Sequence, residues 1–261
     1  MHQSEQNQQN IWNSPEIVAS FRRSRPSASL LEFTEELASG AEHTRRLRIL
    51  DIGCGAGRNS VPLARAGHTV FGIDVARSMI EAAHEHAVEA GVSSRCTFRP
   101  GRMDALPLDE PGFDLIVAHG VWNLAESEET FRAAVAEAAR LSRPGASLFV
   151  TTFSRNTLPP EAQPVAGTRF VFTDFNGSPQ CFLREHELRE ELAEAGFSVA
   201  PDRPVVELNR PAAWEQRHTV GQSGPWRGLN TALPQRGRRV NVAGPKRPVI
   251  YEGVWYRERG G

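Results

Sequence analysis

The sequence predicts a doubly wound α/β fold built on a mostly parallel β-sheet. From about residue 47 to residue 208, short apolar segments of strand length alternate with longer segments of helical periodicity, the pattern of successive β–α units. One strand-like segment, Phe113–Ala118, is almost purely apolar, as a strand covered on both faces requires. A turn with three glycines, Gly53–Gly57, joins the first strand to the helix that follows. These observations together indicate a parallel sheet with helices on both faces.

The N-terminal region, residues 1–45, is predicted to be a polar tail followed by a helical cap. Its first ten residues are polar and rich in Gln. Ser14 followed by Pro15 is typical of a helix start, and this helix is expected to run to about Arg23. Apolar residues at helical spacing predict a second helix from Ser27 to Ala38.

The remaining chain, residues 46–261, is predicted to be one α/β domain with an insertion at about 209–247. Strands are predicted over residues 47–52, 69–73, 96–99, 113–118, 146–152, 197–208 and 248–257. Helices are predicted over residues 58–66, 126–142 and 184–196, and a further helix follows Asp74 and ends near Ala90. The stretch 209–247 is read as an insertion or long loop because it contains many Gly, Pro and Arg residues.

Composition argues against several classes of function. The formal net charge of −1 provides no field that would attract a polyanion, so nucleic acid is not an expected partner. No apolar run approaches the length of a membrane span, so we expect a cytoplasmic protein without a membrane partner, either a monomer or a homodimer. The three cysteines, Cys54, Cys96 and Cys181, are isolated and odd in number, which favours reduced thiols. The eight histidines have no metal-ligand spacing, so no metal site is expected.

The glycine turn carries the strongest chemical signal. Glycines accept positive φ and let a ligand lie against the main chain, and the helix that follows turns its free N–H groups toward that ligand. Asp74 ends the second predicted strand, 21 residues after Gly53, a distance that suits a carboxylate binding the two hydroxyls of a ribose. A dinucleotide fingerprint would require glycine at position 58, where the chain has Arg58. An NAD-dependent reductase therefore remains only a residual alternative.

An acidic residue followed by x-G-x-G-x-G, here Asp51 to Gly57, resembles the first motif of the class I S-adenosylmethionine-dependent methyltransferases. The resemblance covers about residues 47–208 and the closing strand. It implies a seven-stranded Rossmann-like sheet with an antiparallel last strand, and N-terminal helices that partly cover the cofactor. It also implies S-adenosylmethionine as the cofactor and S-adenosylhomocysteine as its product.

The same resemblance assigns roles along the chain. Asp51, with the backbone of Gly53 and Gly55, would meet the methionine part of the cofactor. Asp74 would accept hydrogen bonds from the ribose hydroxyls. Met79 would pack on the adenine, and Asp104 would accept a hydrogen bond from the adenine amino group. The full set of predicted cofactor-binding residues is Asp51, Gly53, Cys54, Gly55, Gly57, Asp74, Val75, Met79, Met103, Asp104 and His119. Plainer roles stay open: a structural turn for the glycines, a helix cap for Asp74, core packing for Met79 and a strand end for Asp104.

His119 is the candidate catalytic residue, because it lies just past the fourth predicted strand and imidazole titrates near neutral pH. Methyl transfer is an in-line displacement that alignment and water exclusion can accelerate, and it needs a base only when the acceptor arrives protonated. His119 could equally bind the cofactor or satisfy a buried hydrogen bond. For the acceptor we expect a wall formed by Trp12, Trp122, Asn123 and Phe172, although aromatic residues more often fill core.

Three functions are compatible with the sequence. The leading hypothesis is methyl transfer to a small-molecule acceptor. The second is methylation of a macromolecule, most plausibly RNA, through the basic groups Arg22, Arg23, Arg25 and Arg236, Arg238, Arg239, although such clusters are usually solvated surface. The third is a cofactor-binding module without catalysis. Turnover separates the third from the others, and salt-dependent RNA affinity would separate the second from the first.

Overall fold

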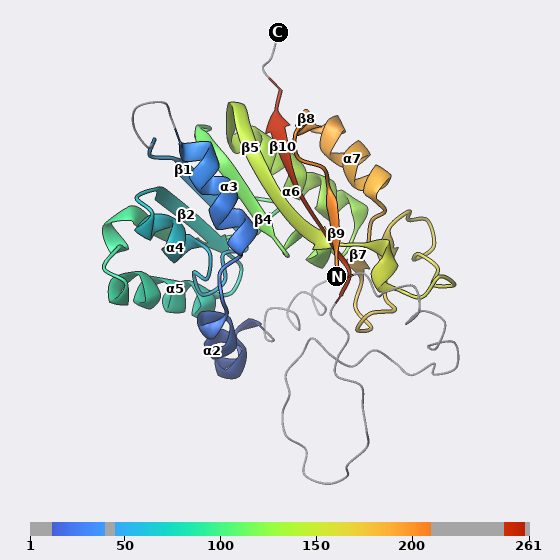
Figure 1. Ribbon diagram of the computed structural model, residues 1–261. Helices are drawn as coiled ribbons and strands as arrows, with labels where there is room; N and C mark the ends of the chain where they lie inside the picture. Colours follow the sequence, from blue (N-terminus) through green and yellow to red (C-terminus); the bar gives the residue numbers. More distant parts are fainter. Residues whose placement is uncertain (1–11, 40–44, 210–247, 259–261) are drawn as a thin grey trace.

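A computed structural model describes residues 12–39, 45–209 and 248–258 (Figure 1). The strands are β1 Arg48–Ile52, β2 Thr69–Asp74, β3 Cys96–Pro100, β4 Phe113–His119, β5 Ser142–Phe153, β6 Val171–Phe172, β7 Gln180–Cys181, β8 Phe197–Val199, β9 Val206–Leu208 and β10 Ile250–Arg257. The helices are α2 Pro15–Arg23, α3 Ala28–Ala38, α4 Ser60–Arg65, α5 Arg77–Glu89, α6 Glu128–Leu141 and α7 Glu185–Glu194, with short 3-10 turns η1 Ser93–Arg95, η2 Trp122–Leu124 and η3 Arg155–Thr157. The predicted insertion lies almost entirely outside the described residues.

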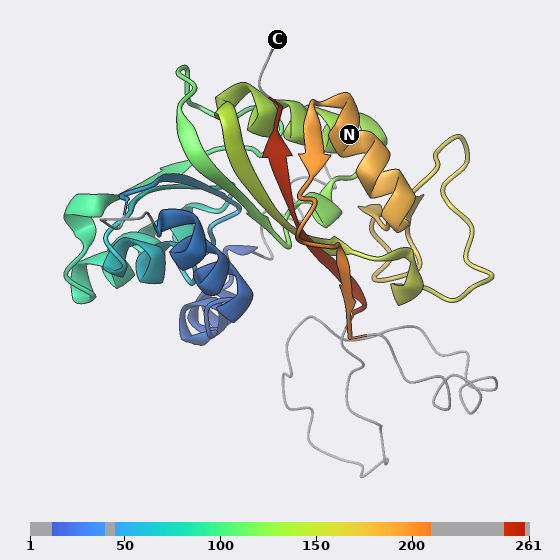
Figure 2. The ribbon, with the colours of Figure 1, turned by 45° about the horizontal axis from the view of Figure 1, so that its top comes forward.

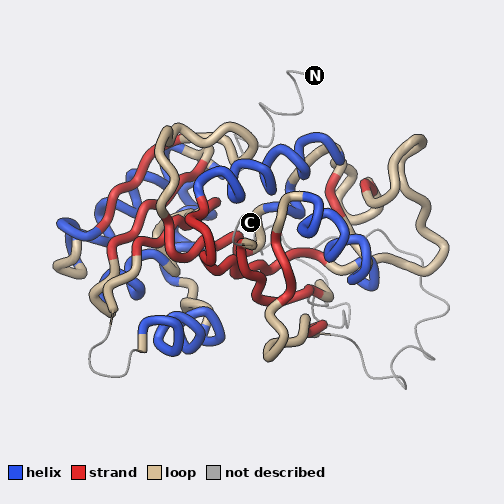
Figure 3. The backbone as a smooth tube through the Cα atoms, turned by 90° about the horizontal axis from the view of Figure 1, so that it is seen from above, coloured by secondary structure: helices blue, strands red, loops and turns tan. Residues whose placement is uncertain are grey.

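The main sheet has eight strands in the order β3-β2-β1-β4-β5-β10-β8, and β9 also pairs with β10. Strands β3, β2, β1, β4 and β5 are mutually parallel, whereas β10 runs antiparallel to β5, β8 and β9. Helices α3, α4 and α5 cover one face and α6 and α7 cover the other, so the sheet lies between two helical layers (Figure 3). The doubly wound fold with an antiparallel last strand is confirmed.

The main sheet has eight strands where seven were predicted, and β6 and β7 form a separate antiparallel pair. The segment predicted as a single strand over 197–208 forms two short strands, β8 and β9, which pair with opposite halves of β10. Pro201 and Pro204 lie between them. Proline lacks the N–H that a ladder needs and fixes φ, so a continuous strand cannot pass through this stretch.

The core is divided by the sheet into two clusters. In β1, Ile49 packs toward α3, α4 and α5, whereas Leu50 and Ile52 pack toward α6 and α7. Residues 113–118 of β4 are all buried, which explains why this strand is apolar on both faces. The two faces of the sheet contact different helices, so a shift of one residue in a strand would turn its core side chains toward the other helical layer. The alternation of side chains therefore fixes the pairing register of the strands.

The N-terminal helices form as predicted, and α2 is attached to α5. Arg22 of α2 forms ion pairs with Glu85, at 3.0 Å, and with Glu89. Just before α2, Asn13 Oδ1 accepts hydrogen bonds from Ser78 N at 3.2 Å and Ser78 Oγ at 2.7 Å. These contacts hold α2 along α5, with the segment before α2 at the start of α5 and Arg22 near its end.

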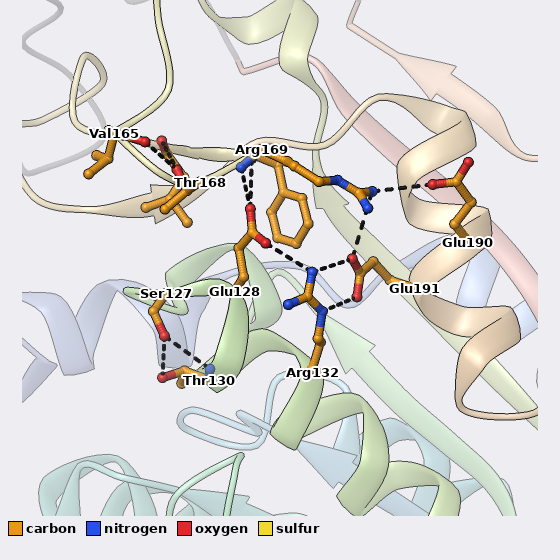
Figure 4. Close-up of polar contacts among 11 residues, drawn as sticks. Ser127, Glu128, Thr130, Arg132, Val165, Thr168, Arg169, Glu190 and Glu191 are labelled. Atoms are coloured by element: carbon orange, nitrogen blue, oxygen red, sulfur yellow. Dashed lines mark hydrogen bonds and ion pairs between the residues drawn. The ribbon is translucent and has the colours of Figure 1, made fainter.

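A polar cluster, here called the α6–α7 network, joins α6 to α7 and to the segment before β6 (Figure 4). It consists of Glu128, Arg132, Arg169, Glu190 and Glu191. Arg132 Nε and Nη2 donate to the two carboxylate oxygens of Glu191 at 2.8 and 2.9 Å, and Nη2 also donates to Glu128 at 2.9 Å. The other oxygen of Glu128 accepts from the backbone N–H of Arg169. The network therefore holds the irregular segment between β5 and α7 against the helical layer.

Candidate functional site

A pocket of about 200 Å³ lies at the carboxyl ends of β1, β2, β3 and β4. In open α/β sheets this edge, where the strand order reverses, is the usual place for a ligand. The residues that line it are Trp12, Phe21, Ile52, Gly53, Cys54, Gly55, Arg58, Asn59, Ile73, Asp74, Val75, Met79, Gly101, Arg102, Met103, Asp104, His119, Gly120, Val121, Leu124, Glu126 and Thr130. Ten of the predicted site residues thus lie around one cavity: Trp12, Gly53, Cys54, Gly55, Asp74, Val75, Met79, Met103, Asp104 and His119.

The glycine turn forms the floor of the pocket and is fastened to β2. The N–H groups of Gly53 and Cys54 both donate to the carbonyl of Ile73, at 2.7 and 3.1 Å. Gly53 has φ of 71°, and a Cβ there would lie 2.6 Å from Val121 Cγ2. Both the backbone conformation and the close approach of Val121 therefore require glycine at this position.

Asp74 connects the glycine turn to the beginning of α5. One carboxylate oxygen accepts from Gly55 N at 2.9 Å, and the other accepts from Ala76 N at 2.9 Å. Burial raises the pKa of this carboxyl, although both backbone hydrogen bonds act in the opposite direction. Asp74 therefore organises the turn and the residue before α5, but it is not the helix cap that the sequence left open, because the N-cap of α5 is Ala76 and has no side-chain cap. The carboxylate of Asp74 also lies on the pocket wall.

Asp51, near the end of β1, and Gly57, the last residue of the turn, are not among the lining residues. Asp51 Oδ2 accepts a hydrogen bond from Ser60 Oγ at 2.6 Å, and burial raises the pKa of its carboxyl to about 6. Gly57 has φ of 77°, and a Cβ there would lie 3.2 Å from Val61 Cγ2. In this structure Asp51 and Gly57 contribute to the conformation of the turn through these contacts. Direct contact of either residue with a cofactor stays a prediction.

A different part of the wall comes from the ends of β2 and β3. Val75, Met79 and Met103 contribute its apolar surface, while Asp104 and Arg102 contribute its charged groups. Arg102 Nε and Nη2 donate to the two carboxylate oxygens of Asp104 at 3.0 and 2.9 Å. Met79 also packs in a small cluster under α2, so its pocket and core roles coexist.

His119 lies at the end of β4, where its ring stacks on Phe149 at 6.4 Å between centroids. Arg58 Nη2 lies 3.1 Å from His119 Nδ1. Because a guanidinium can only donate, Nδ1 must accept, and the proton of the neutral ring is on Nε2. Burial, with the charge of Arg58, lowers the pKa of His119 to about 4. A neutral ring with its proton on Nε2 can only donate through that nitrogen, and its Nδ1 lone pair is already bound to Arg58, which argues against the predicted base role.

Arg58 is the most unusual group of the pocket. Its guanidinium has no carboxylate oxygen within 4 Å among the described residues, although Asp51 lies near enough to favour its charge. Burial lowers the pKa of Arg58. Burying a cation without a close anionic partner costs free energy of folding, and a ligand that supplies an anion would offset this cost.

Three of the four predicted acceptor residues lie outside the pocket wall. Trp122 is fully buried and packs edge-on against Phe131, at 6.0 Å between centroids. Asn123 is also buried beside it. Phe172 lies in a separate cluster, edge-on to Phe182 at 6.1 Å and under the Arg155 guanidinium at 4.9 Å. Trp122 and Phe172 fill core, and only Trp12 lines the pocket.

Several lining residues were not anticipated from the sequence. Arg58 directly follows the glycine turn, where the sequence indicates a mismatch to the dinucleotide motif and the start of a predicted helix, but not a binding residue. Phe21 comes from α2, where its ring meets Trp12 edge-on at 5.7 Å and covers Gly55. The helical spacing of α2 could have suggested that an apolar face lies over the turn. Glu126 and Thr130, at the start of α6, gave no local signal.

Comparison with known proteins decides the family. Residues 49–145 match a family described as a methyltransferase domain. A ubiquinone biosynthesis O-methyltransferase from Methylobacterium nodulans is 31% identical over 178 residues, which cover 67% of this chain and 69% of the relative. The chain belongs to the class I S-adenosylmethionine-dependent methyltransferases. The family predicted from the glycine turn is thereby confirmed, and S-adenosylmethionine is the cofactor of that family.

Other comparisons show how far this methyltransferase resembles its relatives. The enzyme of the same name from Chelativorans sp. (strain BNC1) is 35% identical over 166 residues, 62% of this chain and 63% of the relative. The match thus spans slightly less than two thirds of the length of the Chelativorans enzyme. The crystal structure of magnesium protoporphyrin IX methyltransferase from Synechocystis PCC 6803, with bound S-adenosylmethionine, superposes with a TM-score of 0.60 at 16% identity and covers 99% of both chains. That likeness supports the fold.

The described residues contain neither a cluster suited to a metal ion nor a helix suited to spanning a membrane. Across residues 12–39, 45–209 and 248–258, no three His, Cys, Asp or Glu side chains are grouped so that they could hold a metal ion. Within the same ranges, no helix has the length and apolar character that crossing a membrane would require.

Proposed function

We propose that this methyltransferase moves the methyl group of S-adenosylmethionine to an oxygen of a small-molecule acceptor. One observation supports the proposal most directly: a single pocket joins the glycine turn and Asp74 to the charged and apolar groups at the ends of β3 and β4. An extended ligand with a nucleoside at one end and an amino acid at the other has this distribution of chemistry. The name of the relatives, O-methyltransferase, favours oxygen as the acceptor atom.

The residues present fit the cofactor. We assign the ribose hydroxyls to Asp74, whose carboxylate keeps lone pairs beyond its two backbone hydrogen bonds. Val75 and Met103 offer apolar surface for the adenine ring, with Asp104 beside them for its amino group. Gly55 also lines the pocket, and because it has no side chain its main chain can be approached by a ligand; a Cβ there would lie 3.4 Å from Phe21 Cδ1.

The transfer itself needs alignment more than proton chemistry. The cofactor supplies a methyl group on a positively charged sulfur. The acceptor oxygen, deprotonated before it enters the pocket, would receive this methyl group by displacement of the neutral thioether. Trp12 and Phe21 narrow the pocket from the α2 side, and Val121 and Leu124 wall it beyond β4. This apolar enclosure would exclude water and hold the acceptor oxygen in line with the methyl group.

Calorimetric binding of S-adenosylhomocysteine and NADH to the purified protein tests the cofactor. We expect binding of S-adenosylhomocysteine alone, weakened about tenfold or more by Asp74→Ala. Asp109→Ala, at an exposed acid of the loop before β4, is the matched control and should leave the affinity unchanged. Because Asp74 also holds Gly55, adenosine and 2′-deoxyadenosine should be compared as well. The preference for adenosine should vanish in Asp74→Ala if the carboxylate binds the ribose.

Transfer of a labelled methyl group to a panel of phenols and carboxylic acids then tests turnover. Product that carries the label on oxygen would support the proposal. Binding of S-adenosylhomocysteine without transfer to any acceptor, including RNA, would instead favour a cofactor-binding module. NADH binding alone would contradict the assignment.

A further inference from the structure

Arg58 carries a positive charge that the protein does not neutralise by direct contact. Its guanidinium lines the pocket, and its one described hydrogen bond runs to the neutral ring of His119 at 3.1 Å. The other pocket arginine, Arg102, differs because both oxygens of Asp104 already face it. A guanidinium presents five N–H donors, so Arg58 keeps several donors for a ligand.

His119 adds a second donor at the same place. Its Nδ1 is occupied by Arg58, so the proton lies on Nε2, and Nε2 meets no acceptor in the described part of the chain. Stacking on Phe149 with an interplanar angle of 7° holds the ring plane in position. Arg58 thus acts on His119 as a positioning residue that fixes its tautomer.

The position of this pair along the sheet restricts what it can bind. Arg58 follows β1 and His119 ends β4, whereas Met103 and Asp104 follow β3. Strand β4 lies three positions from β3 in the sheet, a separation of about 14 Å. A ligand whose adenine lies near Asp104 would therefore place its opposite end near Arg58.

We propose that Arg58 and His119 form a carboxylate-binding site in which Arg58 supplies the charge and His119 donates through Nε2–H. The inference rests on the proposed function, because the cofactor must occupy the remaining pocket. Two sources offer the same chemistry: the methionine carboxylate of the cofactor, and a carboxylate on the acceptor. An arginine is well suited to either, since its planar fork matches the two oxygens of a carboxylate.

Calorimetry with a pair of ligands tests the charge. S-Adenosylhomocysteine and its decarboxylated analogue, which keeps the amine, should be titrated into wild type, Arg58→Met and Arg58→Lys. If the cofactor supplies the carboxylate, wild type should prefer S-adenosylhomocysteine by about ten- to a hundredfold. Arg58→Met should abolish that preference, and Arg58→Lys should restore part of it. Arg102→Met is the matched control, because it removes a pocket guanidinium that is already paired and should leave the preference unchanged.

Benzoate binding distinguishes the other source. The probe is titrated into the S-adenosylhomocysteine complexes of wild type and Arg58→Met. If the acceptor supplies the carboxylate, the preference between the two cofactor ligands is unaffected by Arg58→Met, but benzoate binding weakens about tenfold or more. The proposal is overturned if Arg58→Met changes neither quantity. That outcome would leave the proposed function standing, because wild type would still bind S-adenosylhomocysteine.

The tautomer of His119 has its own readout. Nitrogen-15 NMR of the imidazole separates a protonated from an unprotonated ring nitrogen. In wild type at pH 7 we expect the proton on Nε2, and in Arg58→Met we expect a mixture of both tautomers. A wild-type ring with its proton on Nδ1 would contradict the assigned donor.

Discussion

Two arginines in different parts of the molecule meet opposite surroundings. Arg132, in the α6–α7 network, donates to both oxygens of Glu191 and to Glu128 at 2.8 to 2.9 Å. Arg58, in the pocket, meets a neutral imidazole and no carboxylate at ion-pair distance within the described ranges. The network arginine is satisfied by the fold, whereas the pocket arginine is left for a ligand. Charges that a fold leaves uncompensated in a cleft are therefore useful guides to function.

The two regions meet at the start of α6, where Glu126 and Thr130 line the pocket and Glu128 belongs to the network, but their other elements lie apart. In Figure 1 and Figure 2 the yellow segment between β5 and α7 lies at the opposite end of the molecule from α5, which borders the pocket. Changes in the α6–α7 network and in the segment between β5 and α7 should therefore alter the free energy of unfolding without altering ligand affinity. Changes in the pocket should alter ligand affinity without altering the free energy of unfolding. Each prediction below tests one side of this contrast.

The largest expected effect belongs to Phe172. Its side chain is 2% exposed and packs against Phe182 and the Arg155 guanidinium. Phe172→Ala should lower the free energy of unfolding by about 3 to 5 kcal/mol because it opens a cavity in a packed cluster. Urea denaturation measures this loss. Phe175→Ala, at a half-buried ring of the same cluster, is the matched control and should cost less.

The affinity of Phe172→Ala for S-adenosylhomocysteine and for acceptors should equal that of wild type. Weaker acceptor binding with unchanged stability would return Phe172 to the acceptor wall predicted from the sequence. The contrast between the two regions would then fail at this position.

The pH dependence of stability should reveal the buried, neutral His119. Its pKa is about 4 in the folded chain, against an ordinary value of 6.5, so the unfolded chain binds the proton more readily. The stabilisation from the neutral ring is complete above pH 6.5 and is lost as the pH falls toward 4. Between pH 7.5 and 4.5, wild type should lose about 2 to 3 kcal/mol of unfolding free energy relative to His119→Asn.

The difference between the two proteins is the quantity to measure, by urea denaturation at each pH. Asp51 acts in the opposite sense in both, because its raised pKa of about 6 makes the folded chain hold a proton more tightly as the pH falls. A constant difference from pH 7.5 to 4.5 would mean that His119 titrates normally, and the donor assignment would lose its support.

The glycine turn and Asp74 could be predicted because their signal is local. A strand, a turn with glycines at fixed spacing and a helix are specified by neighbouring residues, and Asp74 follows at a fixed distance along the same β–α–β unit. The interaction of Arg58 with His119 joins residues 61 positions apart through the pairing of β1 with β4. No local pattern reports such a contact.

The acceptor wall could not be predicted for a different reason. Trp12, Trp122 and Phe172 are all aromatic, yet only Trp12 lies on the pocket wall. Aromatic rings serve core and binding surface by the same burial of apolar area, so residue type alone does not separate the two roles. Whether such a ring lies in the core or on the pocket wall depends on the face of the sheet that it contacts and on the helix that packs over it.

Arg132 tests the network side of the contrast directly. Arg132→Met would remove the nearer cation of the Glu191 carboxylate, whose side chain is 2% exposed, and leave it with Arg169 Nη2 at 3.8 Å. We expect a loss of about 2 to 3 kcal/mol, below the full cost of a wholly buried pair because Arg132 itself is partly exposed. Affinity for S-adenosylhomocysteine should not change. Arg189→Met, which breaks only an exposed pair with Glu185, should cost about 0.5 kcal/mol or less.

The smallest expected effect on the free protein is that of Arg58→Met. The variant loses the hydrogen bond to His119, about 1 kcal/mol, but it also removes a cation that burial disfavours. Its free energy of unfolding without ligand should therefore lie within about 1 kcal/mol of wild type. With S-adenosylhomocysteine at saturating concentration, a tenfold weaker ligand would separate the two proteins by about a further 1.4 kcal/mol. A loss as large as that of Arg132→Met without ligand would show that Arg58, too, is compensated by the fold, because only a paired charge destabilises so strongly when it is removed.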